Sequence, residues 1–329
     1  ERESAMKFNL FKHPLFRGAV ALLSLAAILA YAFWPRLFTQ ADESTGDIAA
    51  TEAESLPPSA TTSPADAEAA PTFGETLTAL LSEISTQEKT EALILDELHS
   101  GIYTADEPLI LDNPYGCSPL TALAVFTTDE PASVLVRVHG KTSDADISHD
   151  FPALETEHLI PIYGLYADEQ NTVTLTTTLA SGQKVETTFQ IQTDAIDPNT
   201  IKNVIIQTDI EDASAMSEGV NFLSTQKLAF DAHGDIRWVN STWATPTSAL
   251  YAYEDGTYIT FYGAYLEGDT LLIERNFLGK FLRVWYSPYG VHHDIEADSN
   301  GNLLVTGSKG ATIEDFVYEL DADTGEIVH

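Results

Sequence analysis

The sequence predicts an all-β protein: an N-terminal β-sandwich of immunoglobulin-like size, followed by the first blades of a β-propeller, with a transmembrane or signal helix before both. Two observations predict the folded part. From Leu109 onward, short runs of β-branched and aromatic residues alternate with polar residues, which is typical of strands. In the last third of the chain, turn signatures containing glycine recur at nearly constant spacing, which is typical of a repeat architecture.

Residues 1–36 are predicted to form a signal anchor or a signal peptide. The basic stretch Lys7–Arg17 is followed by the uncharged and mostly apolar stretch Gly18–Trp34, which is the order of an export signal. Ala30-Tyr31-Ala32 would suit cleavage. The apolar segment is also about long enough to cross a bilayer. The bulky Phe33-Trp34 just after the cleavage position, and the long acidic segment that would space a folded domain from a membrane, favour an uncleaved anchor. We therefore expect a membrane-anchored protein whose later residues lie outside the cytoplasm.

Residues 37–73 are predicted to be a disordered acidic linker, because Asp and Glu are mixed there with Ala, Thr, Ser and Pro and cannot form a core. A helical segment is expected over residues 74–104. Thr72–Glu75 has the spacing of a capping box, and large aliphatic residues follow at helical spacing from Leu77 to Ile84. This pattern predicts one or two short helices.

Residues 105–197 are predicted to form the β-sandwich. Ser133–His139 and His158–Tyr163 are rich in strand-forming residues, and Thr172–Thr176 and Val185–Ile191 alternate cleanly on either side of a turn. Several short strands with turn signals between them favour a sandwich.

Residues 198–329 are predicted to form about two and a half propeller blades. Gly234, Gly256, Gly279, Gly301 and Gly325 close turns at steps of 22, 23, 22 and 24 residues. Two hairpins per 45 to 46 residues correspond to one four-stranded blade. An ordinary antiparallel sandwich with hairpins of similar length is the alternative. Because a closed propeller needs about four to eight blades, we expect a longer protein or a ring completed from elsewhere.

The tandem histidine His292-His293, followed by Asp294, lies at the start of the strand that leads into the Gly301 turn. Imidazole near neutral pH serves as a nucleophile or a proton carrier. Alternatively, one ring packs within the blade and Asp294 fixes its tautomer. Zinc binding is a further reading, but neighbouring side chains of a strand diverge, so the two histidines would rarely share one ion. No metal and no cofactor are expected.

The remaining polar residues are expected to be structural. Arg237, Arg275 and Arg283 are interpreted as surface charges on outer strands, and His233 as a solvated turn residue. The histidines of the sandwich, among them His158, are assigned packing or surface roles. A single cysteine and a formal charge of −34 exclude an internal disulfide in these residues and disfavour binding to nucleic acid.

Several motifs together resemble the bacterial arylsulfate sulfotransferases. The runs Asp112–Leu123, Val138–Lys141 and Ile160–Tyr166 resemble the N-terminal domain of that family. Leu228–Trp238 and His292–Asn302 resemble the opening of its propeller. The resemblance extends from about residue 105 to residue 329, with the motifs in the same order throughout.

This resemblance implies an exported six-bladed propeller that moves a sulfuryl group from a phenolic sulfate ester to a phenol through a sulfated histidine. It implies that His293 is an assisting histidine at the propeller axis; its neighbour His292 is the second candidate. The nucleophile and the His-x-Asn and Ser-Ser-Arg-His motifs of the family do not occur in these residues. We therefore expect part of an active site. A membrane-tethered, noncatalytic binding propeller is the alternative, and a metal-dependent propeller hydrolase is a further one.

Overall fold

The computed structural model describes residues 73–198, 200–201, 219–223, 227–241, 250–253, 256–263, 268–308 and 316–328. The predicted N-terminal helix of residues 1–36 lies outside these residues, as does the predicted linker up to residue 72. Within the described ranges, no helix has both the length and the apolar character needed to cross a membrane.

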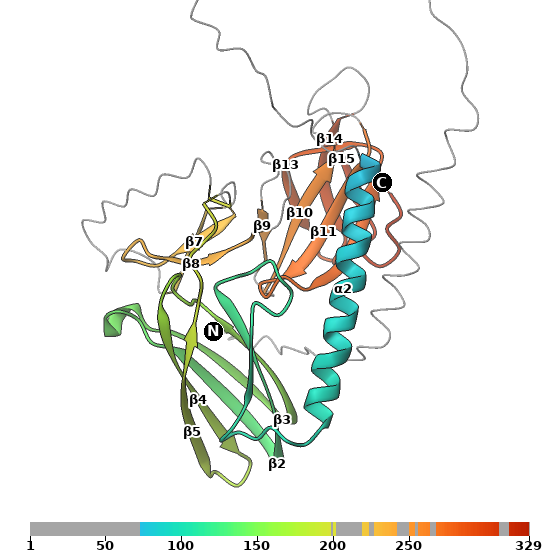
Figure 1. The fold of residues 1–329 in the computed structure, drawn as a ribbon. Helices are drawn as coiled ribbons and strands as arrows, with labels where there is room; N and C mark the ends of the chain where they lie inside the picture. The colour runs from blue at the N-terminus through green and yellow to red at the C-terminus, as the bar shows by residue number, and fades with distance from the viewer. Residues whose placement is uncertain are drawn as a thin grey trace, which may run out of the picture.

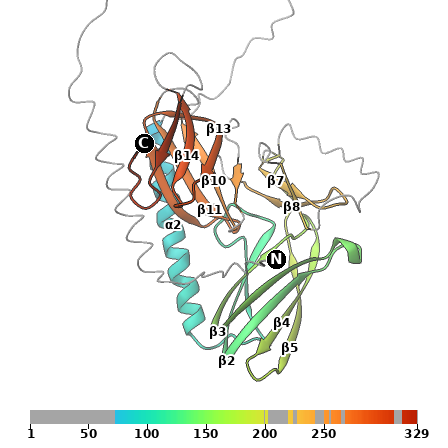
Figure 2. The same ribbon diagram turned by 180° about the vertical axis from the view of Figure 1, so that it is seen from behind.

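The expected helical segment is one long helix, α2 (Phe73–His99). Its buried residues include Leu77, Leu80, Ile94 and Leu98, which recur at intervals of three, four or multiples of a turn and so form one apolar stripe. The polar Gln87 lies on this same stripe and is buried with it. Figures 1 and 2 show α2 running alongside both the N-terminal and the C-terminal sheets.

The expected two-sheet sandwich is instead one five-stranded antiparallel sheet, which we call the curled sheet. It consists of β1 (Leu109–Asp112), β2 (Thr121–Val138), β3 (Ile147–Tyr163), β4 (Gln170–Leu179) and β5 (Lys184–Gln192). β3 pairs along one edge of β2; β1 and then β4 pair along the other edge, and β5 follows β4.

The curl comes from the length of β2. Its pairing with β3 shifts register twice, between Thr127 and Ala132 and between Ala132 and Val134. Such bulges bend a strand without ending it, so two long strands replace the pairs of short strands that a sandwich would have. The first half of β2 is buried on both faces: Ala124 faces the interior of the curl, whereas Leu123 and Val125 face α2.

Three antiparallel sheets follow, each made of strands consecutive in sequence; we call them the C-terminal sheets. The first contains β6 (Asn221–Leu223), β7 (Leu228–Phe230) and β8 (Ile236–Val239). The second contains β9 (Leu250–Ala252), β10 (Thr257–Gly263), β11 (Thr270–Asn276) and β12 (Phe281–Ser287). The third contains β13 (Gly290–Ala297), β14 (Leu303–Ser308) and β15 (Phe316–Leu320).

The second sheet has the four strands of one blade and is buried on both faces. Leu272 and Trp285 pack against the β13–β15 sheet, whereas Leu271 and Ile273 pack against α2. The strands therefore carry apolar residues continuously, as expected when both faces are covered. Sheets that follow one another and stack in this way are compatible with propeller blades, and the propeller itself stays a prediction.

Candidate functional site

The candidate site is the start of β13, which carries His292 and His293. β13 is the first strand of its sheet and pairs with β14. Val291 and Ile295 on either side of the histidines are buried in the core shared with the four-stranded sheet. The backbone at this point is therefore anchored before and after the tandem histidine. The two imidazoles themselves lie outside the part of the chain whose side chains are described.

The pairing of β13 with β14 is interrupted at the tandem histidine. Val291 pairs with Gly307 and Ile295 pairs with Val305, so the three residues 292–294 lie opposite the single residue Thr306. Such a bulge redirects side chains and breaks simple alternation. Which faces His292 and His293 occupy stays a prediction, because their side chains lie outside the described part of the chain.

Three hydrogen bonds hold the bulge in place. The Asp294 amide donates to Thr306 Oγ1 (3.1 Å), and this hydroxyl donates to the Asp294 carbonyl (3.1 Å). The Ile295 amide donates to the Asp294 carboxylate (3.0 Å). The Asp294 carboxylate thus accepts a hydrogen bond from the backbone of the bulge, and the tautomer-fixing role considered for it stays a prediction.

Tyr253 connects the bulge to the neighbouring sheet. Its hydroxyl donates to the Ile295 carbonyl (3.0 Å). Burial, and then the carboxylates of Glu296 and Glu274, raise the pKa of this phenol, so it remains a donor across the physiological range. Among the described residues, no three His, Cys, Asp or Glu side chains gather in an arrangement that would hold a metal ion.

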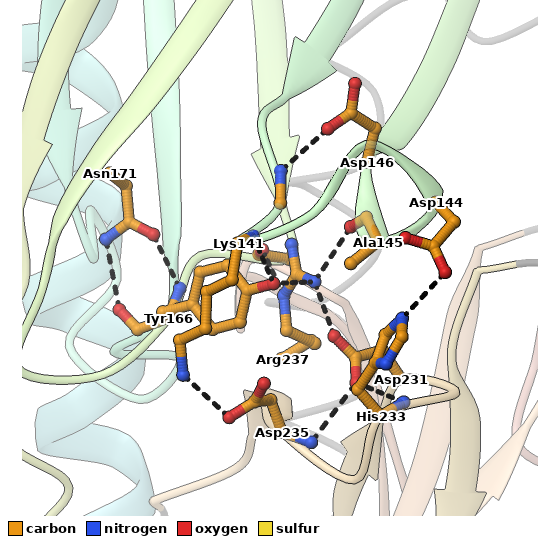
Figure 3. A network of polar contacts seen from close by, with 12 residues as sticks. Lys141, Asp144, Ala145, Asp146, Tyr166, Asn171, Asp231, His233, Asp235 and Arg237 are labelled. Atoms are coloured by element: carbon orange, nitrogen blue, oxygen red, sulfur yellow. Dashed lines mark hydrogen bonds and ion pairs between the residues drawn. The ribbon is translucent and has the colours of Figure 1, made fainter. Parts of the chain in front are cut away.

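Arg237 is buried, contrary to its interpretation as a surface charge. It lies on β8 with a fully buried side chain, and its Nη1 pairs with Asp231 Oδ2 (2.7 Å). The same guanidinium donates to the carbonyls of Gly164 (2.8 Å) and Ala145 (3.1 Å), and it lies over the Tyr166 ring. Figure 3 shows this network, in which one cation joins the curled sheet to the β7–β8 turn.

Two further ion pairs flank Arg237 at the same junction. Lys141 Nζ contacts Asp235 Oδ1 (2.8 Å), and His233 Nε2 contacts Asp144 Oδ2 (3.2 Å). His233 is thus partly exposed and paired across the junction, rather than merely solvated. The polar groups in Figure 3 are directed at one another. We therefore interpret the network as a contact that holds the curled sheet against the β7–β8 turn.

The other two arginines differ from each other. Arg275 on β11 is only 2% exposed, stacks on Phe281 and approaches Glu83 of α2 (3.4 Å), so its surface interpretation is wrong. Burial raises the pKa of Glu83, and the positive charge of Arg275 opposes that rise. Arg283 is 42% exposed at its side chain and pairs with Glu274, which agrees with its interpretation as a surface charge.

Sequence reasoning missed Gln87 and Glu91 of α2. Gln87 is 5% exposed and occupies a position of the apolar stripe. Its place in the helical period was the signal in the sequence, because a polar residue at a buried helical position needs hydrogen-bond partners.

Comparison with known proteins matches two successive parts of the chain. Residues 109–194 match the arylsulfotransferase Ig-like domain, and residues 206–329 match the arylsulfotransferase (ASST) domain. The chain is also 37% identical over 90 residues to the arylsulfate sulfotransferase AssT of Lelliottia amnigena. That alignment covers 26% of this chain and 15% of the relative; the chain therefore matches only a small part of the relative's length.

Proposed function

We propose that this chain, which belongs to the arylsulfotransferase family, takes part in transferring a sulfuryl group from a phenolic sulfate ester to a phenol. The observation that carries the proposal is the match of two successive domains of that family in their order along the chain. The bulge that presents the tandem histidine on β13 supports it further, because bulges are frequent beside active sites.

The proposed chemistry consists of two displacements through a sulfated histidine. In the first, an imidazole nitrogen attacks sulfur, the ester S–O bond breaks and the phenolate leaves with the electron pair. In the second, the acceptor phenol loses its proton, its oxygen attacks sulfur and the N–S bond breaks. We assign His293 the role of donor to the departing phenolate and to the sulfuryl oxygens. We assign the nucleophile to none of residues 1–329.

The proposed setting is a propeller outside the cytoplasm. The three C-terminal sheets would be successive blades, and β13, as the first strand of its sheet, would lie towards the central channel. The apolar segment Gly18–Trp34 would anchor the chain to a membrane. Donor and acceptor would reach the histidines from the channel, where excluded water strengthens each donor's interaction with the developing charge.

The function is tested by the turnover of p-nitrophenyl sulfate with phenol as acceptor, measured on the full reading frame. We expect His293→Ala to lower kcat/KM by about 100-fold or more, because a general acid typically contributes that much. The kcat/KM of His292→Ala, compared with that of His293→Ala, shows which of the two neighbouring histidines the reaction needs. His99→Ala at the exposed end of α2 is the matched control and should leave the rate unchanged.

Three outcomes would overturn the assignment. Undiminished turnover by a folded His293→Ala protein would remove His293 from the site. An inactive full reading frame that still binds phenolic sulfates would favour the noncatalytic binding propeller. Loss of activity after chelation of divalent metal, restored by adding the metal back, would favour the metal-dependent hydrolase instead.

A further inference from the structure

Three acidic or amide side chains of α2 lie along one face of the helix, at the junction between the curled sheet and the C-terminal sheets. They are Glu83, Gln87 and Glu91, each four residues from the next, which places them above one another on a helix. All three contact residues far away in sequence.

Gln87 bonds to the backbone on both sides of the junction. Its Nε2 donates to the Tyr115 carbonyl (3.3 Å), which belongs to the loop before β2. The same nitrogen donates to the Gly279 carbonyl (3.1 Å), and Oε1 accepts from the Phe281 amide (2.9 Å). One buried amide thus satisfies three backbone groups from two domains, and buried backbone groups left unpaired are costly.

Glu91 repeats this connection with charged bonds. The Tyr115 hydroxyl donates to Glu91 Oε2 (2.6 Å), and Lys280 Nζ donates to Oε1 (2.6 Å). Glu91 therefore contacts the same two loops as Gln87, one turn further along the helix. The Cys117 thiol joins the two loops directly, since it donates to the Gly279 carbonyl (3.3 Å).

Apolar residues pack on either side of these three. Leu77 and Leu80 pack on β11 and β12, with Leu271 and Ile273. Ile94 and Leu98 pack with Leu123 and Val125 of β2, in a cluster that also contains Leu278 of the β11–β12 turn. The second half of the helix therefore contacts both domains, and the polar middle lies at their junction.

The β6–β8 sheet and α2 cover the same side of the four-stranded sheet. Tyr258 of β10 packs against Ala229 and Trp238 of the β6–β8 sheet, and α2 packs on β11 and β12 beside it.

We propose that α2 is an interdomain clasp: its Glu83, Gln87 and Glu91 fix the orientation of the curled sheet relative to the C-terminal sheets. The helix ends at His99, before the first residue of either family match, 109, so neither matched domain contains the clasp. The inference rests on contacts alone and is independent of the proposed sulfuryl transfer.

The test is amide hydrogen exchange on the full chain, comparing the native protein with Gln87→Leu. Leucine keeps the helix and the buried volume but removes the bonds of Gln87 to the Tyr115 carbonyl and the Phe281 amide, and it leaves the Gly279 carbonyl with the Cys117 thiol alone. We expect exchange at Phe281 and in the loops 113–118 and 276–281 to accelerate by about tenfold or more. Residues of the interior of β2 and β4 should be unchanged. Glu88→Leu, on the exposed face of α2, is the matched control.

A second variant decides the question if Gln87→Leu does not fold. Glu91→Gln keeps an acceptor for Tyr115 and removes the charge that binds Lys280. We expect faster exchange in both loops, with added salt reducing the difference from the native protein. Unchanged exchange in both loops of a folded variant, or acceleration spread evenly over the chain, would overturn the clasp. Neither result would bear on the sulfuryl-transfer assay.

Discussion

The imidazole of His158 is enclosed in the curled sheet. It is 3% exposed, stacks on the Phe126 ring at a centroid distance of 4.6 Å, and its Nε2 lies 3.0 Å from Thr128 Oγ1. Burial lowers the pKa of His158 to about 4, because the charged form would lose its hydration with no carboxylate in contact to replace it.

This environment predicts a pH-dependent stability. Because the pKa of His158 is lower in the folded protein, the unfolded chain binds a proton at a higher pH than the folded chain does. The contribution of His158 to stability is therefore complete above about pH 6.5 and is lost as the pH falls towards 4. Between pH 7.5 and 4.5 we expect His158 to account for a loss of about 2–3 kcal/mol in the free energy of unfolding. Urea denaturation at the two pH values measures it.

His158→Gln is the comparison, because glutamine still bonds to Thr128 and does not titrate. The variant should lose correspondingly less stability over the same pH interval. Equal losses in the two proteins would show that other groups cause the acid sensitivity.

At the scale of single residues, the sequence indicated some environments and not others. The packing or surface role given to His158 is confirmed, since it follows from its position on an alternating strand. The burial of Arg237 could not be predicted, because its partners Gly164 and Ala145 lie 73 and 92 residues away. The tandem histidine stood out by adjacency, but its bulge depends on the register with β14.

Among the structural elements, the glycine turns show how the repeat is built. Gly279 and Gly301 both have left-handed backbones, with φ of 90° and 87°, which favour glycine. Asn276 and Asp298, each three residues earlier, accept backbone amides with their side chains and hold the turns. The two turns differ in their surroundings: a Cβ at Gly301 would meet open space, whereas one at Gly279 would collide with Cys117 Sγ.

We predict unequal costs for alanine at these two turns. Gly301→Ala should cost about 1–2 kcal/mol, which is the strain of a left-handed alanine. Gly279→Ala should cost at least about 2 kcal/mol more, because overpacking adds to the strain. Chemical denaturation of both variants gives the difference.

The double variant Gly279→Ala with Cys117→Ala separates the two causes. Removing the sulfur should recover part of the loss, so the two substitutions should be non-additive. Equal costs at the two turns, or strict additivity of the pair, would contradict the collision.

Strands and turns were predictable where the sequence pattern that specifies them is local. The hairpin turns and most of the strands follow from glycine spacing and alternation. The length of α2 did not follow, because Gln87 and Glu91 interrupt its apolar period and are satisfied only by loops from two other parts of the chain. The single curled sheet was missed for the same reason: the bulges of β2 depend on its pairing with β3.

At the scale of the whole molecule, the change from the N-terminal sheet to the later hairpins was predictable and the contacts between them were not. The spacing of turns separates the curled sheet from the C-terminal sheets, and the acidic segment predicted before them lies outside the described residues. The joints between them are the Arg237 network on one side and α2 on the other (Figures 1 and 3). Both joints consist of residues that look like ordinary surface polar groups in sequence.

The measurement that tests the proposed function most directly is the fate of the sulfuryl group. The full reading frame is incubated with p-nitrophenyl sulfate and phenol, and phenyl sulfate, inorganic sulfate and p-nitrophenolate are quantified together. We predict that phenyl sulfate forms in a one-to-one ratio with p-nitrophenolate and that inorganic sulfate stays at background. Release of p-nitrophenolate with inorganic sulfate alone, or no release at all, would contradict a sulfuryl transfer between phenols.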